Sequence, residues 1–279
     1  MKKKTMSLFS NVQIVEGLLE RAGLWKVPKY GLALGGGGAK GFAHIGVLTA
    51  LEQFGIRPQI MSGVSAGYIA AVLYGAGLTP HDMIDCFAEF QKFGDFTEWS
   101  LPKTGFFSIR KFGKMLESWL PVKNLEDMKI PTIVCATNIE KGTSVGWCKG
   151  EIIPRVLASC SIPILFNPVR INGSYFVDGG VLRNLPAWAI RDYCKVLIGS
   201  NCSPLNREYK HKPTLLGIAE RTFQLMSKSN ALQDINLCDY VISPETISQS
   251  KTFDLTSLKK NVEIGYDAAC RVLETMQIR

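Results

Sequence analysis

Short apolar runs alternate along the chain with segments in which apolar residues recur every three or four positions. The apolar runs predict strands over residues 30–34, 57–61, 132–137, 144–148, 175–177, 196–200 and 240–242. The helical spacing predicts helices over residues 41–54, 66–76, 81–93, 108–120, 152–160, 214–235 and 256–277. Strands that alternate with helices indicate an α/β fold with a largely parallel sheet covered by helices on both faces.

The N-terminal segment has a pattern of its own. Apolar residues from Leu8 to Trp25 follow the spacing of an amphipathic helix, and basic residues surround them. Two interpretations stay open: this helix packs on the domain or on a second copy of it, or it rests on anionic lipid. No low-complexity linker divides the chain. We therefore expect a basic amphipathic extension over 1–29, a main domain over 30–243, and a C-terminal helical segment over 244–279 packed on the same domain.

Composition places the chain among globular proteins. Of its 279 residues, 46% are hydrophobic and 20% charged, so a sizeable core is available. The longest nearly apolar stretch, Tyr68–Leu78, is much shorter than the roughly 20 residues that a membrane-spanning helix needs. We expect no such helix and, because polar residues interrupt the first apolar run, no signal peptide. Eight scattered cysteines without a C-x-x-C pair predict reduced thiols in a cytoplasmic protein.

The formal net charge of +8 is unevenly distributed. Residues 1–30 hold six Lys or Arg against two Glu, which accounts for half of the excess. The remainder is spread without a basic block or an RNA-binding aromatic motif, so we expect no nucleic-acid partner. The charge points instead to membrane approach or docking by the N-terminal segment.

A glycine-rich turn follows the first strand of the main domain. It reads Gly35, Gly36, Gly37, Gly38, Ala39, Lys40 and Gly41. Glycines let the backbone approach a ligand closely, and the helix that follows adds N–H donors, so this turn is suited to negative charge. A dinucleotide site would need an acidic residue about 20 positions further on, and a phosphate loop would need Ser or Thr after the lysine. The sequence has neither.

The second motif has the G-x-S-x-G pattern, placed between a predicted strand and a predicted helix. It reads Gly63, Val64, Ser65, Ala66 and Gly67. Glycines on both sides of the serine allow a sharp turn that projects its hydroxyl above the sheet edge. The context predicts a nucleophile elbow with Ser65 as the nucleophile.

A serine nucleophile needs a base, and the three histidines are poorly placed for that role. His44 lies in the helix after the glycine turn, where a packed or capping residue is expected. His81 begins another helix, and His211 lies in a polar run that reads as an exposed loop. A carboxylate is available at the end of a short strand, in Asp178-Gly179-Gly180. That motif is weak by itself and gains weight from the other two.

Together, the glycine turn, the elbow and the Asp-Gly-Gly motif, in this order, resemble the patatin-like phospholipase family, in particular its small bacterial members. The resemblance covers roughly residues 30–240. It implies a three-layer α/β/α sandwich and acyl-ester hydrolysis without a metal or cofactor. By position, Ser65 would be the nucleophile, Asp178 the proton acceptor, and the backbone N–H groups of Gly36, Gly37 and Gly38 the oxyanion hole. Lys40 either adds positive charge near that anion or is an ordinary solvated or salt-bridged lysine.

The implied function is hydrolysis of fatty-acyl esters of (lyso)phospholipids or related lipids, in lipid catabolism. Two other classes stay open: a Ser–His esterase of the α/β-hydrolase type and a non-catalytic lipid-binding module. The aromatic residues between Phe87 and Trp119 fit either packed helices or a groove for acyl chains. A lipid ester is the expected substrate, and a peripheral membrane contact and a homodimer are the expected candidates for further association. Head-group and chain-length preference are not encoded in any recognisable motif.

Overall fold

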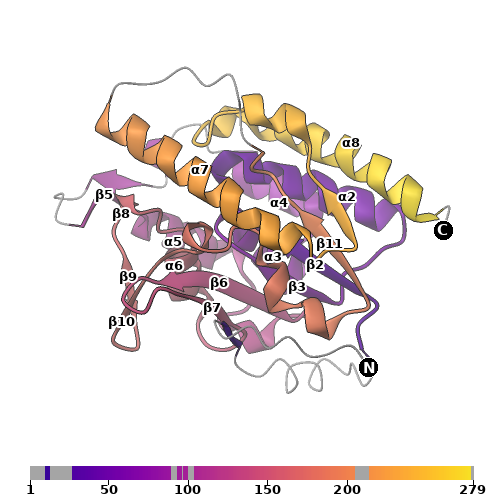
Figure 1. The fold of residues 1–279 in the computed structure, drawn as a ribbon, viewed down its shortest axis with the longest axis horizontal. Coiled ribbons are helices and arrows are strands. Elements are labelled where there is room, and N and C mark those ends of the chain that lie inside the picture. The colour runs from indigo at the N-terminus through magenta and orange to yellow at the C-terminus, as the bar shows by residue number, and fades with distance from the viewer. Residues whose placement is uncertain are drawn as a thin grey trace.

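The computed structural model describes residues 10–12, 27–88, 93–95, 97–99, 104–204 and 214–277. Figure 1 shows a central sheet with helices packed on both of its faces, which confirms the predicted three-layer α/β/α fold. The order of strands along the sheet is β1, β7, β6, β3, β2, β11 and β12, with β10 and β9 joined beside β6.

Most neighbouring strands of the sheet are parallel. All pairs from β6 through β3, β2 and β11 to β12 are parallel, whereas β7, β10 and β9 join by antiparallel pairing. The strands of this sheet are β1 (Ser10–Val12), β2 (Tyr30–Leu34), β3 (Ile60–Gly63), β6 (Thr132–Asn138), β7 (Thr143–Trp147), β9 (Val169–Ile171), β10 (Ser174–Asp178), β11 (Val196–Ser200) and β12 (Tyr240–Ile242).

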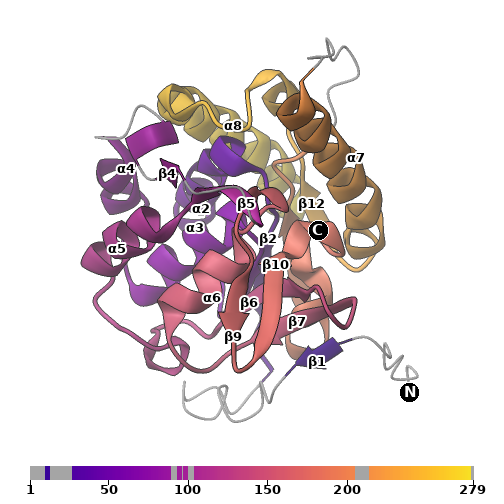
Figure 2. The same ribbon diagram turned by 90° about the vertical axis from the view of Figure 1, so that its left-hand side faces the viewer.

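Helices cover the two faces unequally. In Figure 2, α2, α3 and α5 lie on one side of the strands and α7 lies on the other. The α-helices are α2 (Ala43–Gln53), α3 (Ala66–Ala76), α4 (Pro80–Ala88), α5 (Arg110–Trp119), α6 (Ile152–Ser159), α7 (Leu215–Ile235) and α8 (Leu258–Gln277). The 3-10 helices are η1 (Gly38–Phe42), η2 (Phe93–Asp95), η3 (Leu125–Asp127), η4 (Gly179–Val181), η5 (Pro186–Ala189), η6 (Arg191–Tyr193), η7 (Glu245–Gln249) and η8 (Leu255–Ser257). Within the described ranges, no helix combines the length and apolarity needed to cross a bilayer.

Successive side chains of a strand point to opposite faces of the sheet. In the central strands successive residues are apolar, so both faces of the sheet are apolar. Leu32 and Leu34 of β2 belong to the core under α2, α3 and α8, whereas Ala33 between them belongs to a second core. The second core includes Leu185 and Ala231, from the segment before η5 and from α7. This burial on both faces explains why the central strands read as continuous apolar runs in the sequence.

From residue 30 onward, the predicted elements agree with the observed ones apart from their ends. Residues 89–92 of the helix predicted over 81–93 lie outside the described residues. The strand predicted over 57–61 begins only at Ile60, because Pro58 has no N–H to donate to the ladder. The helix predicted over 41–54 divides into η1 and α2. A three-stranded sheet of β4 (Glu98–Trp99), β5 (Gly105–Ser108) and β8 (Ile164–Phe166) was not predicted. These strands have two to four residues, too few to show a period.

The helix predicted over residues 8–25 is wrong at residues 10–12, which form β1 and pair in parallel with β7. The rest of that prediction lies outside the described residues. At the other end of the chain, α8 packs along α2, and Asn261 of α8 donates its side-chain N–H to the Ala39 carbonyl at 3.0 Å. The C-terminal helix therefore reaches the glycine turn.

Candidate active site

The glycine turn and Ser65 lie at the same edge of the sheet. The turn follows β2 and Ser65 follows β3, and these neighbouring strands are parallel, so their carboxyl ends meet. Asp178 is the last residue of β10, which pairs with β6 on the other side of β3. In open α/β sheets ligands bind outside these strand ends. The fold thus brings the three motifs together, as the sequence predicted.

Ser65 occupies a strained turn between β3 and α3. Its φ of 53° and ψ of −126° lie in a region that non-glycine residues rarely adopt. The Ser65 N–H donates to Ser159 Oγ at 2.9 Å, and Ser159 Oγ donates to the Cys135 carbonyl at 2.7 Å. A Cβ at Gly67 would overlap the Leu34 carbonyl, so only glycine fits there. These contacts hold the backbone of the predicted elbow in place.

The carbonyls of the glycine turn are held on one side by hydrogen bonds. His44 Nε2 donates to the Gly35 carbonyl at 2.8 Å, and Ser203 Oγ donates to the Gly36 carbonyl at 2.6 Å. The C=O and N–H of a trans peptide point in opposite directions. The N–H of Gly37, which shares its peptide with the Gly36 carbonyl, is therefore directed away from Ser203.

The N–H groups of the turn differ in whether they already have an acceptor. The Gly36 N–H donates to the Asn184 carbonyl at 3.1 Å, and the Ala39 N–H donates to the Thr252 carbonyl at 2.7 Å. Among the described residues, nothing accepts a hydrogen bond from the N–H of Gly37 or Gly38. Gly38 has a φ of 59°, which glycine adopts without strain. Two adjacent N–H donors are thus available for a ligand.

Asp178 is completely buried. Its Oδ1 accepts the Gly180 N–H at 2.7 Å, and its Oδ2 has no hydrogen-bond partner of good geometry within the described structure. Burial raises the pKa of Asp178 from 3.8 to about 7, although the nearby Ser65 hydroxyl and the Gly180 N–H favour the charged form. One carboxylate oxygen therefore stays available for a proton in the pH range where the group titrates.

Helix α7 supports the turn that carries Asp178. Asn230 donates to the carbonyls of Gly180 at 2.8 Å and Val181 at 3.1 Å, and its Oδ1 accepts the Asn184 N–H at 2.8 Å. Ser227 Oγ also donates to the Gly180 carbonyl, at 3.1 Å. Asn230 and Ser227 could not be identified from the sequence, because a polar side chain on a helix gives no signal of the turn that it supports.

The histidines do not take the place of a catalytic base in the described structure. His44 is buried and shares hydrogen bonds with Ser200 Oγ and the Gly35 carbonyl, each at 2.8 Å. Burial lowers its pKa to about 4, so it stays neutral and packs as the sequence predicted. His81 is exposed and pairs with Asp85 at 3.1 Å. His211 lies outside the described residues.

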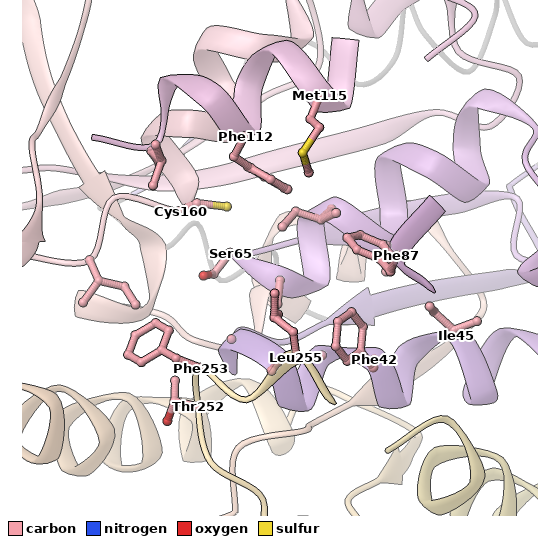
Figure 3. Close-up of a pocket in the computed structure, with 18 of the residues that line it drawn as sticks. Phe42, Ile45, Ser65, Phe87, Phe112, Met115, Cys160, Thr252, Phe253 and Leu255 are labelled. Atoms are coloured by element: carbon pink, nitrogen blue, oxygen red, sulfur yellow. The ribbon is translucent and has the colours of Figure 1, made fainter. Parts of the chain in front are cut away.

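Ser65 lies on the walls of two cavities. The larger has about 930 Å³ of empty space, and its lining is almost entirely apolar. Figure 3 shows Ser65 facing this cavity together with Phe42, Phe87, Phe112, Met115, Phe253 and Leu255. Phe87 and Phe112 come from the aromatic-rich segment of the sequence. Phe87 also packs edge-on against Phe42 and Trp119. Both interpretations of that segment, packing and groove, therefore apply.

The smaller cavity, of about 490 Å³, has more polar lining residues than the larger one, and we call it the polar cavity. Ser65 shares it with Asp178, Lys40 and the three glycines Gly36, Gly37 and Gly38. Lys40 is only 7% exposed and forms no ion pair with a described residue, so it is not the solvated lysine of the alternative interpretation. Burial lowers its pKa, while nearby Cys202 and Glu220 act to raise it. Within the described ranges, no cluster of three His, Cys, Asp or Glu is arranged to hold a metal ion.

Known proteins resemble part of the chain in sequence. Lysophospholipase NTE1 of Candida glabrata is 30% identical over 164 residues, which are 56% of this chain and 9% of that protein. Neuropathy target esterase sws of Drosophila melanogaster is 33% identical over 168 residues, which are 56% of this chain and 12% of that protein. The chain therefore spans only a small part of these relatives.

The fold is also similar to a solved structure, VipD from Legionella pneumophila. The TM-score is 0.52 over 90% of this chain and 67% of that one, at 16% sequence identity, a likeness that shows the fold alone. The sequence profile of the family described as "Patatin-like phospholipase" matches residues 32–190, which include all three motifs. Because this match extends over more than half of the 279 residues, the chain belongs to the patatin-like phospholipase family.

Proposed function

We propose that this protein is a serine acyl hydrolase that cleaves fatty-acyl esters of (lyso)phospholipids or related lipids through a Ser65–Asp178 dyad. One observation carries the proposal. A serine on a strained turn shares a polar cavity with a buried carboxylate and with two backbone N–H groups. Among the described residues, one carboxylate oxygen and both N–H groups have no hydrogen-bond partner. Nucleophile, base and oxyanion donors are the three parts that acyl transfer from an ester requires.

The reaction has two steps. Ser65 Oγ attacks the ester carbonyl carbon while its proton passes to Asp178, and the carbonyl oxygen becomes an oxyanion. When the C–O bond breaks, the leaving alcohol takes the proton from Asp178, and the acyl group stays on Ser65. A water molecule then gives its proton to Asp178 and attacks the acyl-enzyme. The fatty acid leaves as Ser65 recovers its proton.

We propose two oxyanion donors, whereas the sequence predicts three. Gly36 was expected to be one of three, but its N–H is used by the Asn184 carbonyl. We assign the oxyanion to the N–H groups of Gly37 and Gly38. Loss of one such donor typically costs about 10²–10³ in kcat. Lys40, on the same cavity, adds a positive charge that favours the anion.

The two cavities suit different parts of the substrate. The apolar cavity suits an acyl chain, and the polar cavity with Lys40 suits the alcohol side of the ester. The relatives NTE1 and sws are named a lysophospholipase and an esterase, which agrees with a lipid ester substrate. We place the enzyme in lipid catabolism, in the cytoplasm, with peripheral contact to the membrane that holds its substrate.

Two substitutions test the dyad. Ser65→Ala and Asp178→Asn are each expected to abolish hydrolysis of p-nitrophenyl acyl esters, because they remove the nucleophile and the base. His81→Ala and His211→Ala are the controls and should keep nearly full activity. Survival of activity in Asp178→Asn, with loss in a histidine variant, would instead support a Ser–His esterase.

A fluorophosphonate probe separates an enzyme from a lipid-binding module. The probe is expected to label Ser65 in the wild type and to leave Ser65→Ala unlabelled, because only an activated serine reacts. A wild-type protein that binds fatty acid but takes up no label would be a binding module. Mass spectrometry of products from a mixed lipid extract, compared with Ser65→Ala, would then identify the natural ester.

A further inference from the structure

The outward face of α7 carries a stripe of exposed aliphatic side chains. They are Leu215, Ile218, Leu225 and Leu232, with exposed fractions of 66%, 50%, 46% and 56%. Their spacing of three and seven residues places them on one side of the helix. The exposed positions between them, Thr222 and Ser229, are uncharged. Soluble proteins rarely expose a contiguous apolar surface of this kind without a binding partner. We call these six residues the outward stripe.

The charges of α7 decide which partner fits. Its two acidic residues face inward: Asp234 is fully buried against Arg183 at 2.6 Å, and Glu220 lines a groove. The helix positions of Arg221 and Lys228, three residues after Ile218 and Leu225, border the outward stripe. The Arg221 guanidinium also donates to Gln224 Oε1 at 3.3 Å. An apolar stripe bordered by cations is complementary to anionic lipid. A second copy of this helix would instead bring like charges together.

The outward stripe also lies close to the candidate active site. The inner face of the same helix lines the polar cavity with Phe223, Gln224 and Ser227, so the two surfaces are about one helix diameter, roughly 10 Å, apart. At the N-terminal end of α7, a groove of about 610 Å³ includes Leu216 and Phe253. Phe253 lines the apolar cavity as well and is seen there in Figure 3. A lipid at the stripe would therefore be next to both cavities.

We propose that the outward stripe of α7 docks on the surface of an anionic lipid bilayer. The four aliphatic side chains enter the interface, and Lys228 lies at the level of the head groups. The proposal rests on the proposed function for the choice of a lipid surface as the partner. It assigns the membrane contact to α7, in a part of the chain beyond the family match.

The test uses the full chain with Ser65→Ala, so that binding is measured without hydrolysis. Co-sedimentation compares vesicles of phosphatidylcholine alone with vesicles that also contain phosphatidylglycerol. We expect binding to the anionic vesicles, and the added pair Ile218→Ser and Leu225→Ser should weaken it about tenfold or more. The matched control is Ile139→Ser in the turn after β6, where the side chain is also 50% exposed. It should bind as before.

A second variant tests the charge without changing the apolar surface. Lys228→Glu is expected to weaken binding to anionic vesicles and to leave the melting temperature unchanged. Unaltered binding of both the double variant and Lys228→Glu would overturn the proposal, since another segment would then hold the membrane. Sedimentation velocity gives a second way to overturn the proposal. If the parent protein is a dimer and the double variant is a monomer, the outward stripe binds a second copy of the chain instead of lipid.

Failure of this proposal can be told apart from failure of the proposed function. With Ser65 intact, the double variant should hydrolyse a short soluble ester at the wild-type rate, because neither residue lines a cavity with Ser65. Normal ester hydrolysis with unaltered vesicle binding would refute the docking surface alone. Absence of ester hydrolysis in the wild type would refute the proposed function and leave the binding result to stand by itself.

Discussion

Asn230 of α7 is expected to position the turn that carries Asp178, and Asn230→Ala tests this. The substitution removes three hydrogen bonds at once: to the carbonyls of Gly180 and Val181 and from the N–H of Asn184. Gly180 keeps its bond from Ser227 Oγ, so two backbone groups lose their side-chain partner. An unsatisfied buried group costs about 1–3 kcal/mol. Asn230 is only half-buried, so water replaces part of the lost hydrogen bonding and lowers this cost. We therefore expect a total loss of about 2 kcal/mol.

Thermal unfolding and steady-state kinetics measure the two consequences separately. A loss of about 2 kcal/mol lowers the melting temperature by about 4–8 °C in a domain of this size. Displacement of the Asp178 turn should lower kcat by about 10- to 100-fold. The KM for a short soluble ester should stay constant, because Asn230 lines neither cavity.

Two further variants make the result specific. Gln233→Ala changes an exposed residue of the same helix and should alter neither quantity. Asn230→Asp keeps the acceptor for Asn184 but sets a negative charge against two carbonyls, so its kcat should fall at least as far as in Asn230→Ala. A lower melting temperature with unchanged kcat in Asn230→Ala would refute the positioning role and leave a purely structural one.

Two other predictions concern the base and the apolar cavity. Asp178 accepts a proton only as a carboxylate, so kcat/KM for a soluble ester should rise with pH up to about 7 and fall about tenfold per unit below it. A flat profile from about pH 5 to 8 would contradict this. Ala70 of α3 lines the apolar cavity, and Ala70→Phe should lower the ratio of long-chain to short-chain ester hydrolysis by about tenfold or more. Equal losses for both esters would contradict an acyl site there.

Much of the fold could be predicted from the sequence because continuous apolar runs mark the central strands and alternate with helical segments. The strand over 30–34 and the helix over 66–76 were located to the residue. The elbow at Ser65 was also predictable, since glycines on both sides of a serine between a strand and a helix have few other uses. Asp178 could be predicted as the candidate base because none of the three histidines is well placed in the sequence.

The features that could not be predicted depend on contacts between distant segments. A run of glycines does not determine the direction of each peptide plane. The hydrogen bond from the Gly36 N–H to the Asn184 carbonyl is therefore visible only in the folded structure. The support that Asn230 and Asn261 give to the two turns joins residues about 50 and 220 positions apart in the chain. Side chains of this kind look like ordinary polar positions on helices.

At Ser65 the proposed reaction and thermodynamic stability favour different residues. A non-glycine residue held at a φ of 53° costs of order 1–3 kcal/mol. Glycine would adopt the same turn without that cost, and it would also remove the hydroxyl that the proposed reaction needs. Random mutation selected for heat resistance alone would therefore favour the inactive protein at this position, and only selection for the reaction keeps serine there.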